Sequence, residues 1–353
     1  MDDLDLRAVR ESVDRTLEEF CGARLRQAGG RPDGMELERA VAGFVSGGGK
    51  RLRPVLCVLG WYAAGGQGPP PRAVWRVAAA LELFHAFALI HDDVMDDSDR
   101  RRGHPTIHRA FAARRGGNDS SSARRVGTAV AILAGDLALT WSDDLLRTAG
   151  LPPERLVEVW ELVSAMRDEI VHGQFLDVTT PGPRASVEKA LEIARYKTAK
   201  YTFERPLHLG AVLAGAPPRL REALSAYALP AGESFQLRDD LLGVFGDPST
   251  TGKPVLDDLR EGAPTVLLAL AFEHADGAQR ALLEQHIGRP SLEADEADRV
   301  RGILAATGAP GRVKAMIRER HDLAVKALEA AVIPLPVRRA LRTLTDTAVR
   351  RAS

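Results

Sequence analysis

The chain has 353 residues, of which 45% are hydrophobic, so it can bury a large core. Its 48 basic residues balance its 48 acidic residues, so net charge gives no support for a nucleic-acid partner or an anionic membrane surface. Two cysteines cannot form a metal site of their own. The acidic, amphipathic start differs from a signal peptide, and no window holds 18 uninterrupted apolar residues, so we expect a cytoplasmic protein without a membrane span.

Apolar residues recur every three or four positions over almost the whole chain, which is typical of helices. In chain order, the pattern predicts helices at 5–27, 36–46, 52–65, 72–98, 124–149, 153–176, 186–213, 217–245, 263–287, 292–306, 309–332 and 335–351. The Gly- and Pro-rich breaks between them are short, as between packed helices. We therefore predict one all-α domain, 1–353, with a motif-bearing core at about 36–275 and C-terminal helices at 276–353.

The first polar motif, SGGGKRLRP at 46–54, places three glycines before Lys50, Arg51 and Arg53. Such a loop allows backbone N–H groups and several cations to converge on a phosphate. It lacks the Ser or Thr that follows the lysine of a nucleotide P-loop. A solvated basic turn before a helix would have the same sequence, so this motif alone leaves both interpretations open.

The apolar run LELFHAFALI ends in an acidic cluster, HDDVMDDSDRRRG at 91–103. Asp92, Asp93 and Asp96 lie within one turn, and Asp92 and Asp96 share a helix face. These carboxylates repel one another unless a cation neutralises them. Oxygen-only ligands suit Mg²⁺ or Mn²⁺, and Mg²⁺ is commonly shared with substrate phosphates.

Three arginines, Arg100, Arg101 and Arg102, follow the acidic cluster directly. Arginine binds phosphate oxygens through two parallel N–H groups, so arginines beside a metal cluster indicate a diphosphate rather than a single phosphate. The alternative is a solvated helix end, which is rare after so apolar a helix.

A second acidic cluster, QLRDDLLGVFGD at 236–247, contains Asp239 and Asp240. It is followed by GDPSTTGK, which ends at Lys253, and by a further acidic pair at 257 and 258. Between the two clusters lie HGQFLD and YKTAK, whose polar side chains could face a site or only bridge helices and face water: Gln174, Asp177, Lys197, Thr198 and Lys200.

Taken together in this order, the motifs from about residue 45 to residue 265 resemble the trans-type isoprenyl diphosphate synthases, and most of all a bacterial geranylgeranyl diphosphate synthase. The resemblance implies a bundle of largely antiparallel helices around a deep central cavity, usually in a homodimer, with the two aspartate-rich motifs facing each other across the cavity mouth. It also implies Mg²⁺, three ions per active site, with Mn²⁺ as an alternative.

The resemblance assigns roles by position in this sequence. The metal ligands would be Asp92, Asp93, Asp96, Asp239 and Asp240. The allylic diphosphate, which is dimethylallyl, geranyl or farnesyl diphosphate, would contact Arg101, Lys197 and Lys253. Isopentenyl diphosphate would be held by Lys50, Arg53, His85 and Arg102, with Phe235 near its carbon portion. The reacting centre would be lined by Gln174, Asp177, Thr198 and Gln236, together with Lys197.

Two departures from the family pattern stand out. Gly243 occupies the last position of the second motif, where a third aspartate is common, and Asp247 lies too far along to replace it. Ala263 and Pro264 stand where relatives often carry basic residues. These departures put one metal ligand and one auxiliary phosphate contact in doubt.

Product length depends in this family on the helix before the first motif. Helical geometry places Ala88 within about 40° of Asp92 around the axis, so its small side chain leaves room beneath the metal site. Phe84 and Phe87 lie deeper or to the side, where they would stop a growing tail, although both could equally be core residues. We therefore expect a C20 product, geranylgeranyl diphosphate, over C15 farnesyl diphosphate.

Two other functions compete with synthesis. A class I terpene cyclase also ionises an allylic diphosphate, but its second motif usually carries Asn, Ser and Glu at four-residue steps, whereas this chain has an aspartate pair. A non-catalytic relative that regulates a partner synthase would be signalled by loss of aspartates from the first motif. Here that motif is complete, and only Gly243 keeps this alternative open.

Overall fold

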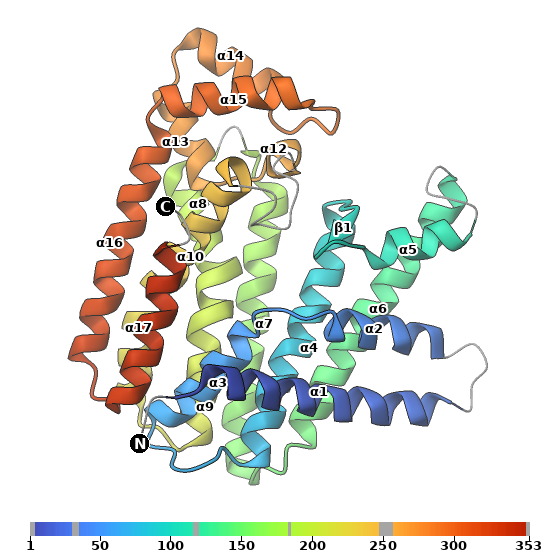
Figure 1. Ribbon diagram of the computed structural model, residues 1–353, viewed down its shortest axis with the longest axis vertical. Coiled ribbons are helices and arrows are strands. Elements are labelled where there is room, and N and C mark those ends of the chain that lie inside the picture. The colour runs from blue at the N-terminus through green and yellow to red at the C-terminus, as the bar shows by residue number, and fades with distance from the viewer. Residues whose placement is uncertain (1–3, 30–34, 116–119, 183–184, 247–256, 351–353) are drawn as a thin grey trace. The chain divides into compact units, whose positions relative to one another are not determined.

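The computed structural model describes residues 4–29, 35–115, 120–182, 185–246 and 257–350, which form helices apart from one two-stranded hairpin in this part of the chain (Figure 1). The all-α fold class is thereby confirmed. The chain divides into two compact units. Residues 5–62 and 66–157 form the N-terminal unit, and residues 1–4, 63–65 and 158–353 form the C-terminal unit. The expectation of one domain around a central cavity stays a prediction.

The N-terminal unit contains six helices and a hairpin among its described residues. They are α1 (Leu6–Ala28), α2 (Met35–Ser46), α3 (Leu52–Ala63), α4 (Arg72–Met95), β1 (Arg100–Arg101), β2 (His104–Pro105), α5 (Ile107–Arg114) and α6 (Ser121–Arg147). The most extensive contact between two elements of this unit joins α4 to α6, and α1 and α2 pack on this pair (Figure 1). Gly135 of α6 permits the close approach, because a Cβ there would overlap the ring of His91 on α4.

Helix α4 is long and apolar enough to cross a membrane by length and composition, but 61% of its most apolar window is buried inside the folded chain. It also contains buried Glu82 and Asp93. This burial is that of a core helix, and it places the first acidic cluster at the end of the best-packed element of the unit.

The C-terminal unit is built around one long helix. Its described elements are α7 (Pro153–Thr179, whose first turn belongs to the N-terminal unit), α8 (Val187–Ile193), η2 (Ala194–Glu204), α9 (Arg205–Leu213), α10 (Pro218–Phe245), α12 (Asp257–Glu261), α13 (Val266–His274), α14 (Gly277–His286), α15 (Ala294–Ala306), α16 (Ala309–Ala330) and α17 (Leu335–Arg350). Helix α10 contacts η2, α9, α12, α13, α16 and α17. Its buried Leu237, Leu241 and Val244 belong to a hydrophobic core cluster, so the second acidic motif lies on a fixed helix.

Segment η2 is a π-helix of 11 residues, and it carries the YKTAK motif. Two glycines let its wider backbone fit between neighbours. A Cβ on Gly173 of α7 would lie 2.5 Å from the backbone nitrogen of Lys197, and a Cβ on Gly232 of α10 would lie 2.5 Å from Cα of Ala199. This packing fixes the backbone at Lys197 and Thr198, and π-helices are rare and often occur at functional sites.

The glycine-rich loop between α2 and α3 is anchored by a buried arginine. Arg51 is 5% exposed, and its guanidinium donates to Asp14 Oδ1 at 2.7 Å, Glu82 Oε1 at 2.7 Å and the carbonyl of Val45 at 2.8 Å. Burial alone would lower its pKa, but Glu82 and Asp14 raise it above the ordinary value. Arg51 is therefore a structural residue, and it is not among the residues to which the family resemblance assigns isopentenyl diphosphate.

Most predicted helix ends agree with the structure to within three residues. The predicted run 263–287 is two helices, because Asp276 starts α14 with a capping box that includes Gln279. Helices α5 and α12 and the hairpin were not predicted, and the run 186–213 is interrupted by η2.

The first prediction concerns the close approach at Gly173. Gly173→Ala should lower the free energy of unfolding by about 1–3 kcal/mol, because the methyl group must displace the backbone of η2. Urea unfolding followed by circular dichroism measures this change. Gly302→Ala in α15 is the matched control, since nothing lies within 4 Å of its Cβ and alanine favours a helix. Equal stabilities for the two variants would contradict the packing described.

The second prediction concerns Arg51. Arg51→Met should cost about 3–5 kcal/mol in unfolding free energy, because the buried carboxylate of Glu82 loses its cation. Arg51→Met combined with Glu82→Leu should recover much of this loss, since no buried charge then remains. Arg7→Met removes an exposed pair with Glu11 and should change stability by less than about 1 kcal/mol. A loss no larger for Arg51→Met than for Arg7→Met would show that the loop does not depend on this arginine.

Candidate active site

The glycine-rich loop and the arginine motif meet in the N-terminal unit. Arg102 and Gly103 have φ of 53° and 79°, and they form the turn of the hairpin in which Arg101 pairs with His104. The guanidinium of Arg102 donates to the carbonyl of Gly48, and a Cβ on Gly49 would lie 2.9 Å from Nη2 of Arg102. Glycine is favoured at 48 and 49 by their positive φ angles, and at 49 it also leaves room for the Arg102 guanidinium.

Positive charges gather around His85 on the neighbouring α4. Burial lowers the pKa of His85 well below its ordinary value, and the guanidinium groups of Arg53, Arg102 and Arg101 lower it further. The exposed Lys50 lies in the loop itself. The structure therefore brings the predicted cations Arg53 and Arg102 to His85, with Lys50 in the loop that Arg102 contacts.

The first acidic cluster is held by Arg101. Nε of Arg101 donates to Asp93 Oδ1 at 2.7 Å, and Nη2 lies 2.5 Å from the same oxygen and 3.4 Å from Asp92 Oδ2. Burial lowers the pKa of Arg101, but Asp93, Asp92 and Asp96 raise it above the ordinary value. Asp93 is 1% exposed, whereas Asp92 and Asp96 are partly exposed. All three predicted metal ligands thus surround one arginine that was expected to bind the diphosphate.

The three residues predicted to set product length differ in their surroundings. Phe84 is 2% exposed, and its ring centroid lies 5.3 Å from that of Phe87. Phe87 also contacts the ring of His91, at 4.8 Å, on the side of α4 that packs against Gly135. Ala88 is partly exposed, one turn before Asp92.

The C-terminal unit connects its predicted residues by hydrogen bonds. Lys197 Nζ donates to Asp177 Oδ2 at 2.6 Å. Thr198 Oγ1 donates to Gln236 Oε1 at 2.5 Å, and Gln236 Nε2 donates to Asp240 Oδ1 at 2.7 Å. These contacts join η2 to α7 and α10.

Two more predicted residues lie on the same helices. Gln174 is partly buried, three residues before Asp177. Phe235 packs against Phe203, with ring centroids 5.7 Å apart, and Arg238 lies over its ring. Lys253 and Asp247 lie outside the described residues.

The second acidic cluster is larger than its motif. Burial raises the pKa of Asp240 to about 8, and the charges of Asp239, Asp258 and Asp177 raise it as well. A hydrogen bond from Gln236 lowers this pKa and only partly offsets the rise. Asp258 comes from α12, and no sequence pattern places it beside α10. Four carboxylates therefore share one region of the C-terminal unit.

Both clusters have the donor chemistry of a Mg²⁺ site, with oxygen ligands and no sulfur or imidazole. Within the described ranges, no group of three or more acidic, His or Cys side chains is arranged so that it could hold a metal ion by itself. Mg²⁺ would therefore need oxygens from waters and substrate phosphates in addition to these carboxylates. At Gly243 the absent side chain leaves a cradle that Asp258 enters, since a Cβ there would overlap Oδ2 of Asp258. The residues present therefore fit the ion.

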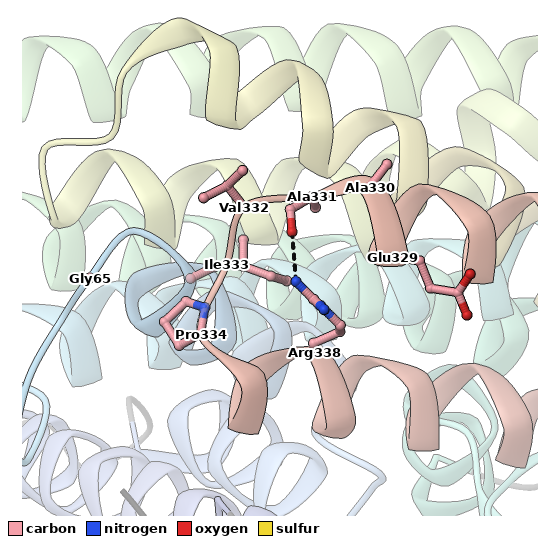
Figure 2. A pocket seen from close by; sticks show the side chains of 9 residues that line it. Gly65, Glu329, Ala330, Ala331, Val332, Ile333, Pro334 and Arg338 are labelled. Atoms are coloured by element: carbon pink, nitrogen blue, oxygen red, sulfur yellow. Dashed lines mark hydrogen bonds between the residues drawn. The ribbon is translucent and has the colours of Figure 1, made fainter.

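A surface hollow of about 500 Å³ lies elsewhere in the C-terminal unit, at the turn from α16 to α17 (Figure 2). Backbone and apolar groups line it, together with Glu329 and Arg338, and Arg338 Nη2 donates to the carbonyl of Ala331 at 2.9 Å. It contains none of the predicted site residues.

Comparison with known proteins agrees with this chemistry. The polyprenyl synthetase family model matches residues 35–304. The chain is 34% identical to octaprenyl diphosphate synthase of Escherichia coli K12, over 87% of this chain and 88% of that protein. It is 33% identical to (2E,6E)-farnesyl diphosphate synthase of Mycobacterium tuberculosis, over 74% and 68%.

Among solved structures, a Corynebacterium glutamicum geranylgeranyl pyrophosphate synthase, crystallised with isoprenyl diphosphate and magnesium, is similar with a TM-score of 0.94 and 39% identity. The alignment covers 99% of this chain and all of that one. The chain therefore belongs to the polyprenyl synthetase family, the trans-prenyl diphosphate synthases, and is a prenyltransferase.

Proposed function

We propose that this enzyme condenses isopentenyl diphosphate head-to-tail with an allylic diphosphate, in a Mg²⁺-dependent reaction, to give geranylgeranyl diphosphate. The observation that carries the proposal is the arrangement on α4. His85 lies two turns before Asp92 on α4, and the adjacent hairpin residues Arg101 and Arg102 contact Asp93 of α4 and Gly48 of the glycine-rich loop. A diphosphate that needs fixed cations and one that needs metal ions could bind next to each other there.

The isopentenyl diphosphate would bind to the cations at the glycine-rich loop. Lys50, Arg53 and Arg102 supply the charge, and His85 is kept neutral by them, so it can donate a hydrogen bond without adding charge. Arg51 does not take part, because its guanidinium is buried against Glu82. The loop is thus pre-ordered by one arginine so that the others can bind substrate.

The allylic diphosphate would bind at the acidic clusters. Asp92, Asp93 and Asp96, together with Asp239 and Asp240, would hold Mg²⁺, which would supply positive charge to the departing diphosphate. Arg101 neutralises Asp92 and Asp93 before substrate arrives and would then turn to the phosphate oxygens. Lys197, held by Asp177, and Lys253 would add further positive charge.

The reacting carbon atoms would lie near the hydrogen-bonded chain of Thr198, Gln236 and Asp240. We propose that these groups, with Gln174, hold their oxygens around the developing allyl cation and keep water away from it. The double bond of isopentenyl diphosphate then attacks, and a proton leaves to the released diphosphate. No nucleophilic side chain is required.

Product length is supported by local features of α4. Ala88 is small and precedes Asp92 by one turn; Phe84 lies one turn before Ala88, and its ring contacts the tilted ring of Phe87. The similarity to a geranylgeranyl pyrophosphate synthase favours C20. The relatives' names also include octaprenyl and farnesyl diphosphate synthases, and farnesyl diphosphate is the second candidate product.

We further propose three Mg²⁺ ions per active site, with Mn²⁺ as a substitute, in a homodimer located in the cytoplasm. These proposals rest on the family resemblance. Neither the cyclase nor the regulatory alternative is favoured by the site, because the first acidic motif and the basic loop are both intact.

The function is tested by incubating the purified full-length protein with isopentenyl diphosphate, Mg²⁺ and one allylic diphosphate at a time, from C5 to C15. Mass spectrometry should identify prenyl diphosphates that end at C20. Asp92→Asn should reduce turnover by at least on the order of a hundredfold, because a metal-binding oxygen becomes an amide. Asp97→Asn is the matched control, since Asp97 is 78% exposed and asparagine accepts its positive φ.

The proposed function would be wrong if no starter were elongated by a folded protein. Elongation that proceeds equally in Asp92→Asn and Asp97→Asn would instead show that Asp92 is not a metal ligand.

Product length gives a further prediction. Phe87→Ala should shift the longest product beyond C20, because a ring that would stop the growing tail is removed. Phe84→Ala tests the deeper position, where full burial predicts a larger loss of stability, about 3–5 kcal/mol. An unchanged product distribution in both variants would assign these rings to core packing alone.

A further inference from the structure

Gly243 stands where the family pattern has a third acidic residue in the second motif. In the structure, α10 brings Gly243 against α12. A Cβ added to Gly243 would overlap Oδ2 of Asp258 and would lie 2.6 Å from its Cγ. The carboxylate of Asp258 therefore fills the place in which a side chain at position 243 would begin.

Helix α12 holds this carboxylate firmly. Leu259, the next residue, is fully buried in the core cluster, and its carbonyl accepts a hydrogen bond from the backbone of Gly288 at 2.9 Å. Arg260 donates through Nε and Nη2 to the carbonyl of Leu292, at 3.1 and 2.8 Å. A short helix that is tied at its buried residue Leu259 and at the next residue, Arg260, cannot easily turn Asp258 away.

The carboxylate also faces the acidic cluster rather than only the glycine. Gly243 lies one turn beyond Asp239 and Asp240 on α10, so a carboxylate packed against Gly243 lies beside the second motif, and all four residues belong to the C-terminal unit. Asp258 is only partly buried, so hydrated ions can reach it. It therefore has the position and the chemistry of the missing acid, although it comes from a different helix.

We propose that Asp258 replaces the third aspartate of the second motif and helps to hold the Mg²⁺ ion assigned to Asp239 and Asp240, either directly or through a water molecule on the ion. This inference rests on the proposed function. In this interpretation Gly243 leaves room for a carboxylate from α12, so the second motif keeps a third carboxylate.

The first test is a Mn²⁺ titration of the full-length protein in the presence of inorganic pyrophosphate, with free Mn²⁺ measured by electron paramagnetic resonance. Asp258→Asn should weaken the affinity of at least one Mn²⁺ ion by about tenfold or more. Glu261→Gln, an exposed charge change on the same helix, should leave the affinity within about twofold. Equal Mn²⁺ affinity in Asp258→Asn and the unchanged protein would overturn the proposal.

The second test moves the carboxylate back to α10. Gly243→Asp alone should bind Mn²⁺ poorly and unfold at a lower temperature, because its side chain collides with Asp258 and adds charge. Gly243→Asp combined with Asp258→Gly should bind Mn²⁺ better than Asp258→Gly alone. A double variant that binds no better than Asp258→Gly would contradict the exchange.

The outcomes separate this inference from the proposed function. Elongation of an allylic diphosphate by the unchanged protein, together with normal Mn²⁺ binding in Asp258→Asn, would refute only the role of Asp258. Absence of elongation by the unchanged protein would refute the function itself, whatever the titration shows.

Discussion

Repulsion between crowded carboxylates is the constraint on which this structure depends. Asp240 is 9% exposed and lies near three other acidic side chains, so burial and like charge together raise its pKa to about 8. In the N-terminal unit the same repulsion is relieved by Arg101, which binds Asp92 and Asp93. The chain thus neutralises part of one acidic cluster with Arg101, and in the other cluster the ammonium of Lys197 binds Asp177. Added cations are the direct way to complete this neutralisation.

Such crowding is possible only on rigid supports. The buried pair of Arg51 and Glu82 holds the glycine-rich loop, and the glycines at 173 and 232 allow η2 to pack backbone against backbone. The first support holds the loop that carries Lys50, and the second holds the backbone that carries Lys197 and Thr198. These residues contribute to chemistry through position, since none of them is proposed to contact substrate, and their loss would misplace several charges at once.

Much of the fold could be predicted from the sequence, because helical periodicity is a strong local signal over long segments. The two aspartate motifs were also visible, since their spacing places Asp92 and Asp96 on one helix face. The π-helix could not be predicted, because it depends on glycines of α7 and α10 that are distant in sequence. The hairpin was missed because Arg102 occupies a positive-φ turn position that favours glycine or asparagine.

Two functional details depend on tertiary contacts and had no sequence signal. Arg51 looks like its neighbours Lys50 and Arg53, yet its guanidinium turns inward to Glu82. Asp258 lies 15 residues beyond Gly243 in the chain, and only the packing of α12 on α10 brings the two together. In both cases the sequence shows the residue type, but only the packing of distant segments determines which residue it contacts.

The most direct test of this account is the melting temperature of the unchanged protein with Mg²⁺ alone, with inorganic pyrophosphate alone, and with both. Carboxylates that need a shared cation and anion should bind the two together, so the combined shift should clearly exceed the sum of the separate shifts. Shifts that are merely additive, or an absence of any shift with both present, would contradict the claim that these acidic clusters bind a metal diphosphate.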